Sequence, residues 1–121
     1  MANLLKTAAE WLSEMRIKHM SESITYKRGV ITVQVLGTRG VTKFEVADES
    51  GLSVYGQIAD WLILTNDLVL GSIHVEPKLG DRITDAAGKV FEVVFLSGDG
   101  CWRYSDPHQI TMRIHTKEVA A

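Results

Sequence analysis

The sequence has a single cysteine, Cys101, and no marked excess of charge of either sign. One cysteine cannot form a disulfide within the chain, which excludes a disulfide-stapled scaffold. The formal net charge of −2 argues against a protein dedicated to nucleic acid or to anionic membranes, since such proteins are normally basic. No apolar run approaches the roughly 18 residues that span a bilayer, and the N-terminus lacks the pattern of a signal peptide. We therefore expect a cytoplasmic protein that does not bind membranes, unless it is exported within a larger assembly.

The sequence also lacks motifs for catalysis or metal binding. The residues that could bind a metal never occur as close pairs with ligand spacing; they are His19, His74, His108, His115 and Cys101. There is no phosphate-binding loop and no G-x-S-x-G elbow. The sequence around Cys101 is more typical of a small residue at the start of a strand than of a reactive thiol. We therefore predict no metal, no cofactor and no enzymatic activity in the chain itself.

Aspartates are concentrated in or beside turns, where their usual role is structural. Their side chains are expected to accept hydrogen bonds from backbone N–H groups. The four residues concerned are Asp81, Asp85, Asp99 and Asp106.

A length of 121 residues and an apolar content of 45% are typical of a single globular domain, which we assign to residues 1–121. Residues 3–19 form the one long stretch with helical periodicity, and Asn3 can cap its start. The apolar positions recur every three or four residues; they are Leu4, Leu5, Ala8, Trp11, Leu12 and Met15. We predict an amphipathic helix within residues 1–20. Its stripe is expected to pack on the rest of the domain, and docking to another subunit is the alternative.

Residues 23–117 have the alternation and turn signals of β-structure. In the first part, strands are expected at 23–28, 30–36, 43–47 and 58–64, with hairpin turns at Gly29 and at residues 37–40. Residues 48–57 are expected to form an exposed loop or a weak strand. Residues 66–71 resemble one helical turn that stops at Gly71.

The C-terminal part, residues 76–117, contains four short strands separated by turns. Pro77 and Gly80 bend the chain into the first strand, residues 85–88 and 97–100 form the next two turns, and Asp106-Pro107 forms the last. Short strands joined in this way predict an antiparallel meander. The fold class is therefore mainly β, a small antiparallel barrel or curled sheet with one N-terminal amphipathic helix and a short helical turn.

One strand alternates aromatic and basic residues, Trp102-Arg103-Tyr104. The favoured interpretation places both aromatic residues in the core and Arg103 in solvent. The alternative is an OB-like module that stacks single-stranded nucleic acid on these residues. A further alternative is a small enzyme whose site forms between subunits.

Four short patterns within residues 58–117 resemble the head–tail joining proteins of tailed bacteriophages, also called head-completion or stopper proteins. The patterns are Pro77-x-x-Gly80-Asp81-x-Ile83, Gly88-Lys89-Val90-Phe91-Glu92-Val93, Trp102-Arg103-x-Ser105-Asp106 and Arg113-Ile114-His115-Thr116-Lys117. The resemblance implies a structural virion protein in the phage neck, present in the host cytoplasm before assembly. It implies a homo-oligomeric ring between a portal or adaptor and a tail or tail-terminator protein. Double-stranded DNA would lie in its channel without sequence-specific binding.

A ring of this kind would use hairpin tips and strand faces for its contacts, with no pocket. The candidate interaction residues are those of the 48–57 stretch and of a basic hairpin tip: Asp48, Glu49, Ser50, Gly51, Leu52, Ser53, Tyr55, Lys27 and Arg28. The candidate structural turn consists of Pro77, Gly80 and Asp81. We predict that Gly80 has a positive φ angle and that Asp81 caps the turn.

Overall fold

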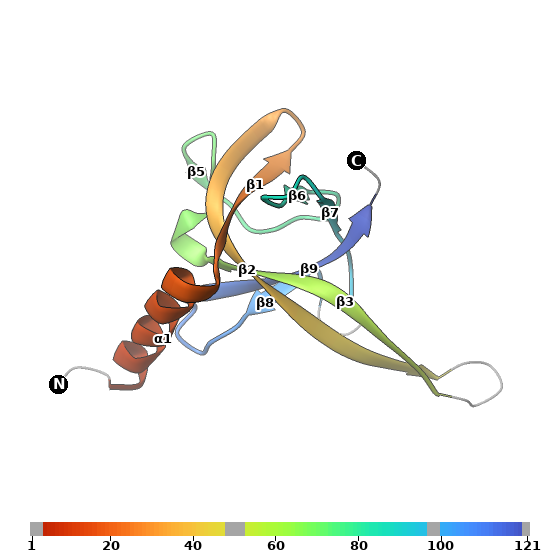
Figure 1. Cartoon of the computed structure of the whole chain (residues 1–121), viewed down its shortest axis with the longest axis horizontal. Coiled ribbons are helices and arrows are strands. Elements are labelled where there is room, and N and C mark those ends of the chain that lie inside the picture. The colour runs from red at the N-terminus through yellow and green to blue at the C-terminus, as the bar shows by residue number, and fades with distance from the viewer. Residues whose placement is uncertain (1–3, 48–52, 97–99, 120–121) are drawn as a thin grey trace.

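The computed structural model describes residues 4–47, 53–96 and 100–119 (Figure 1). Its elements, in chain order, are α1 (Leu4–Met20), β1 (Glu22–Arg28), β2 (Ile31–Ala47), β3 (Ser53–Leu64), the 3-10 helix η1 (Thr65–Asp67), β4 (Val69–Leu70), β5 (Ile73–His74), β6 (Arg82–Thr84), β7 (Val90–Val93), β8 (Trp102–Tyr104) and β9 (Thr111–Val119).

Six strands close into an antiparallel barrel. They follow the order β3-β2-β1-β6-β7-β9, and β9 pairs again with β3 to complete the circle. β8 pairs with β9 as well, and β4 and β5 form a separate small hairpin. The predicted class is confirmed, and the closed barrel rather than the curled sheet is the form that it takes.

The barrel interior is filled by apolar side chains at alternate strand positions. Ile24 and Tyr26 point inward from β1, and Trp61 and Ile63 from β3. The Trp61 ring packs edge to face on Phe91, with 5.4 Å between centroids, an arrangement that aromatic pairs favour. The other core residues are Val35, Leu68, Leu70, Ile83, Val93, Met112 and Ile114.

β2 is one long strand, so the hairpin turn predicted at residues 37–40 is wrong. The strands expected at 30–36 and 43–47 are two parts of it. The two glycines suggested a turn, but they serve close packing instead. A Cβ atom on Gly37 would lie 2.5 Å from the Ile24 Cδ1 atom, and one on Gly40 would lie 3.3 Å from the Arg113 Nη1 atom. Glycine inside a strand often marks such a close approach.

The C-terminal strands do not form the simple meander that was predicted. β9 is nine residues long and pairs with two strands along the same edge. β8 pairs with its first part, from Met112 to Ile114, and β7 with its last part, from Thr116 to Val119. β7 and β8 are neighbours in sequence, but each pairs with β9 rather than with the other.

The helical turn after β3 is confirmed, but it is shorter than expected. η1 ends at Asp67, and the following residues form the β4–β5 hairpin. Gly71 and Ser72 form the turn of that hairpin, both with positive φ angles, so Gly71 does not end a helix. η1 has no side-chain cap.

α1 forms as predicted, but the expectation that its apolar stripe packs on the barrel is wrong. The side chains of Leu5, Trp11 and Leu12 are 76%, 57% and 61% exposed. In Figure 1 the helix extends from the barrel with its N-terminal end pointing away. The proposed cap, Asn3, lies outside the described residues. Within the described part of the chain, no helix is long and apolar enough to cross a membrane.

Candidate functional site

A two-stranded arm, made of residues 42–47 of β2 and 53–58 of β3, projects from the barrel. β9 pairs with β3 only from Ala59 onward, so along the arm the two strands pair only with each other. Figure 1 shows the arm extending far from the barrel, on the side opposite α1. An isolated two-stranded hairpin is marginally stable in water. The arm therefore has the form of a segment that gains support from another molecule.

The predicted interaction stretch, residues 48–57, coincides with the end of this arm. Ser53 and Tyr55 lie in β3, opposite Ala47 and Glu45. Residues 48–52, which include Asp48, Glu49, Ser50, Gly51 and Leu52, lie outside the described residues. Residues 53–57 form a strand, one of the two forms that the sequence allowed.

The arm is held at its base by a buried carboxylate, that of Asp60. His115 Nδ1 lies 2.8 Å from Asp60 Oδ1, and Arg113 Nη1 donates to Asp60 Oδ2 at 2.8 Å. Thr42 Oγ1 donates to the same Oδ2 atom. The Asp60 and His115 side chains are fully buried. These contacts join β2, β3 and β9 at the position where the arm leaves the barrel.

The Asp60 cluster has a structural role. Burial alone would raise the pKa of Asp60, but hydrogen bonds from His115, Thr42 and Arg113 outweigh burial and lower the pKa below its ordinary value. The carboxylate is thus held in its charged form by partners that satisfy it. The Asp60 and His115 side chains expose no surface to a substrate, so this pair is not arranged for general acid–base catalysis.

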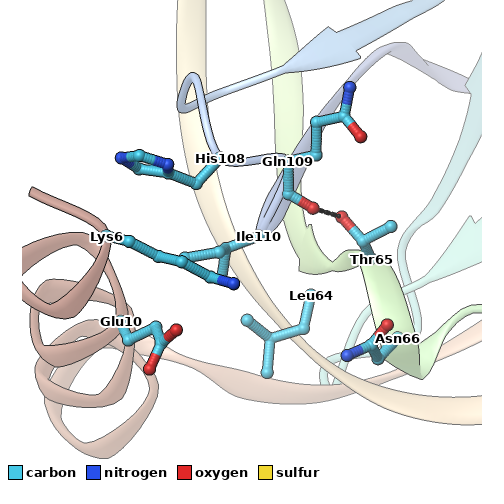
Figure 2. A pocket seen from close by; sticks show the side chains of 8 residues that line it. All are labelled: Lys6, Glu10, Leu64, Thr65, Asn66, His108, Gln109 and Ile110. Atoms are coloured by element: carbon cyan, nitrogen blue, oxygen red, sulfur yellow. Dashed lines mark hydrogen bonds between the residues drawn. The ribbon is translucent and has the colours of Figure 1, made fainter. Parts of the chain in front are cut away.

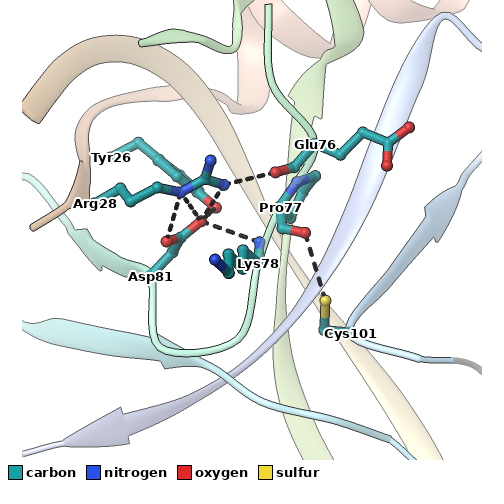
Figure 3. Close-up of polar contacts among 7 residues, drawn as sticks. All are labelled: Tyr26, Arg28, Glu76, Pro77, Lys78, Asp81 and Cys101. Carbon is teal, nitrogen blue, oxygen red and sulfur yellow. Dashed lines mark hydrogen bonds and ion pairs between the residues drawn. The ribbon is translucent and has the colours of Figure 1, made fainter.

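A second buried carboxylate organises the predicted turn at Pro77, Gly80 and Asp81. Gly80 has a φ angle of 87°, and Asp81 Oδ2 accepts a hydrogen bond from Lys78 N at 3.0 Å. As Figure 3 shows, Asp81 also joins Arg28 and the hydroxyl of Tyr26. The turn is therefore anchored to β1.

The Tyr26–Arg28–Asp81 cluster raises the pKa values of Tyr26 and Arg28. Burial, and then the hydrogen bond to Asp81, raises the pKa of Tyr26 far above its ordinary value, so its hydroxyl remains a donor. The hydrogen bond to Asp81 raises the pKa of Arg28. Arg28 Nη2 also donates to the Glu76 carbonyl oxygen at 2.7 Å. Of the two basic residues predicted at the hairpin tip, Lys27 is exposed, whereas Arg28 is held by this cluster.

The other turn aspartates accept backbone hydrogen bonds, as predicted, wherever the structure describes them. Asp85 accepts from Ala87 N and Lys89 N. Asp106 accepts from His108 N, Ile110 N and Thr111 N. Asp99 lies outside the described residues.

Cys101 is a structural thiol. Its Sγ atom donates to the Pro77 carbonyl oxygen (Figure 3), with 3.6 Å between the two atoms. Burial raises the pKa of the thiol. A raised pKa reduces the fraction of reactive thiolate. Within the described ranges, no three His, Cys, Asp or Glu side chains are grouped closely enough to hold a metal ion.

An open hollow of about 480 Å³ lies where α1 meets the barrel, between the helix, the end of β3 and the turn before β9 (Figure 2). Lys6 and Glu10 line it from the helix. His108 and Gln109 line it from the turn, where the Gln109 carbonyl oxygen accepts a 2.8 Å hydrogen bond from Thr65. The mixed charge and polarity of the lining do not resemble the mostly apolar pocket of a small-molecule site.

The Trp102-Arg103-Tyr104 strand has the geometry of core packing. The rings of Trp102 and Tyr104 contact each other edge to face, with 4.9 Å between centroids, and both pack against the core. Arg103 is exposed. Rings engaged with each other in this way do not form an open platform for stacked bases, so this geometry does not favour the alternative of a nucleic-acid-binding module.

Sequence reasoning missed two of the polar contacts that connect strands. Arg39 pairs with the buried Asp85, and its guanidinium carbon lies 5.2 Å from the centre of the Trp61 ring. Asp60 pairs with His115, although 55 residues separate them in sequence. Asp60 carried a signal, because a carboxylate inside an apolar strand requires a partner.

These features define a class of protein: a small closed barrel whose polar clusters are structural and whose most prominent extension is an unsupported arm. The model of the phage head–tail joining protein family matches residues 2–121, nearly the whole chain. The chain belongs to this family, and the resemblance drawn from four short patterns is confirmed. A comparison with curated proteins finds no match.

Membership assigns the protein a structural role in the neck of the phage virion, with portal and tail components as its neighbours. Proteins of this family are structural and are generally not enzymes.

Proposed function

We propose that the protein forms a homo-oligomeric ring between the portal or adaptor and the tail, where it closes the DNA-filled head and provides the docking surface for the tail. The observation that carries this proposal is the family match over residues 2–121. Before assembly the protein is in the host cytoplasm. The DNA lies in the ring channel and is not read by sequence.

The arm is the principal assembly contact. Its strands pair only with each other, so they gain stability when a neighbouring component packs against them. The Asp60 cluster fixes the direction in which the arm leaves the barrel. A contact made by a projecting arm suits a ring that forms on its partners.

The exposed stripe of α1 forms the contact with the next copy in the ring. A ring needs two different surfaces on each subunit, which meet head to tail. Among the described residues, two exposed apolar surfaces in different places fit this requirement. One is the stripe with Leu5, Trp11 and Leu12, and the other is the β1–β2 hairpin tip with Val30 and Ile31, which are 96% and 45% exposed.

The test is an arm-less variant in which residues 43–57 are replaced by Asn-Gly. This dipeptide favours the tight turn of a two-residue hairpin, and Thr42 and Ile58 remain paired at its ends. The variant should melt cooperatively, because every strand that pairs with β9 is retained. In a complementation assay it should give DNA-filled heads without attached tails, or heads that lose their DNA.

The matched control replaces only residues 48–52 with an equally long Gly/Ser segment and leaves the paired strands intact. Electron microscopy of the particles and plaque counts provide the readout. Fully infectious virions from the arm-less variant would refute the role of the arm. Normal tailed particles in a strain that lacks the whole gene would refute the neck role itself.

A further inference from the structure

A row of charged residues crosses the outside of the barrel near the β1–β2 hairpin tip. Lys27 of β1 lies directly opposite Arg82 of β6, Arg82 opposite Glu92 of β7, and Glu92 opposite Lys117 of β9. Three strand spacings separate its ends, a distance of about 14 Å. The row contains three cations and one anion, in a protein whose net charge is −2.

At the Lys27–Arg82 end of this row two positive charges share one nearby carboxylate, that of Glu92. Glu92 approaches Arg82 from the far side, with 3.7 Å between Oε2 and Nη2. In the part of the chain that the structure describes, Lys27 has no carboxylate within salt-bridge distance. Like charges directly opposite each other on paired strands are unfavourable, so this arrangement serves no evident purpose in folding.

An open hollow of about 270 Å³ lies at this position, and its lining consists of Lys27, Gly29, Gly80 and Arg82. Both glycines have positive φ angles, 62° and 87°, and a Cβ atom on either would meet no other atom within 4 Å. The hollow thus combines two cations, bare backbone and free space. An anion could approach the backbone here between the two cationic side chains.

We infer that this hollow and the charged row bind phosphate groups of a DNA duplex backbone. The inference rests on the proposed function, which places duplex DNA in the channel of the ring. Long exposed cations on the outer face of the barrel can position a polyanion without reading its sequence. A duplex carries one charge per about 1.7 Å, so a row of about 14 Å can meet several phosphates.

The experiment compares the full-length protein with the double variant Lys27→Gln/Arg82→Gln in binding to a labelled duplex. Fluorescence anisotropy is measured from about 50 mM to about 200 mM salt, where each phosphate contact contributes about 0.9 to the slope of log affinity against log salt. Loss of two contacts should reduce that slope by about 1.8. Between the lowest and the highest salt concentration, the affinity of the double variant should therefore fall by about tenfold less than that of the original protein. The double variant should fold normally, because both side chains are exposed.

Two controls test whether the effect belongs to this site. Lys6→Gln/Arg103→Gln removes the same charge from α1 and from the aromatic strand, and should keep the slope of the original protein. Arg82→Lys should also keep it. An unchanged slope in Lys27→Gln/Arg82→Gln, or an equal loss in the Lys6→Gln/Arg103→Gln control, would overturn the inference.

Other anions are tested in the same assay. Polyglutamate that binds as tightly as DNA would assign the site to an acidic polypeptide, and inorganic phosphate that displaces DNA at equal ionic strength would assign it to free phosphate. Either result overturns the backbone assignment. The neck role is scored separately, by particle assembly in the strain without the gene, so failure of one hypothesis is distinct from failure of the other.

Discussion

Gly37 provides the sharpest test of the packing between β1, β2 and β3. It is buried in the middle of β2, and a Cβ atom there would lie 2.5 Å from Ile24 Cδ1 and 3.1 Å from Trp61 Cε3. We predict that Gly37→Ala lowers the free energy of unfolding by about 1–2 kcal/mol. Overpacking a core costs about 1–3 kcal/mol. Replacing glycine also lowers the entropy of the unfolded chain, which offsets about 0.4–1 kcal/mol of that cost.

The same geometry predicts a compensating substitution. Ile24→Val removes the Cδ1 atom that the new methyl group would meet, and alone it should cost about 0.5–1.5 kcal/mol. In the Gly37→Ala background that cost should fall by at least about 0.5 kcal/mol, because Ile24→Val removes the atom that the new methyl group would contact. Compensation should be partial, since the contact with the rigid Trp61 ring remains.

The assay is urea unfolding of the four proteins of this double-mutant cycle at neutral pH, followed by tryptophan fluorescence and by circular dichroism. Equal m-values across the set would show that the compared states are the same. The reasoning is refuted if Gly37→Ala is as stable as the original protein. It is also refuted if the two changes add within about 0.3 kcal/mol, the behaviour of sites that do not touch.

Three further predictions concern the Asp60 cluster, the turn at Gly80 and the helix. Asp60→Ala should lose about 3–5 kcal/mol of stability at neutral pH, because it leaves buried partners without their counter-charge. Since the folded-state pKa of Asp60 is lowered, its contribution is present above the unfolded pKa of about 4 and is lost as pH falls through the lower folded value; a gap between the two proteins that is as large at pH 3 as at pH 7 would contradict this. Gly80→Val should reduce the melting temperature by several degrees, because a β-branched residue resists a φ of 87°, and an unchanged melting temperature would count against the turn. Deletion of residues 1–19 should leave a barrel that is soluble and melts cooperatively, because the helix stripe is exposed; aggregation of the truncated protein would show that the helix supports the core.

Much of the fold was predictable because its signals are local. Helical spacing marked α1, and alternation with turn residues marked the C-terminal strands. Gly80 has the backbone conformation that its place in the turn predicted, because only a few residue types tolerate a positive φ. The pattern from Pro77 to Ile83 also contributed to the family resemblance, which the family match over residues 2–121 confirms.

Other features could not be predicted from local patterns. Gly37 and Gly40 read as a turn because a sequence does not state which side chains will lie against them. Here the neighbours come from Ile24, Trp61 and Arg113, on three other strands, and their close approach favours glycine within a continuous strand.

By itself, the sequence determined the class of fold and the family resemblance, since each depends on residue types at fixed short spacings. Only the tertiary structure decided which surfaces remain open. It placed Lys27 beside Arg82, buried Asp60 against His115, and left the stripe of α1 exposed. Such pairings depend on strand register across the closed barrel, where residues more than fifty positions apart become neighbours. A shift of one residue in register would turn the side chains of the shifted strand to the opposite face.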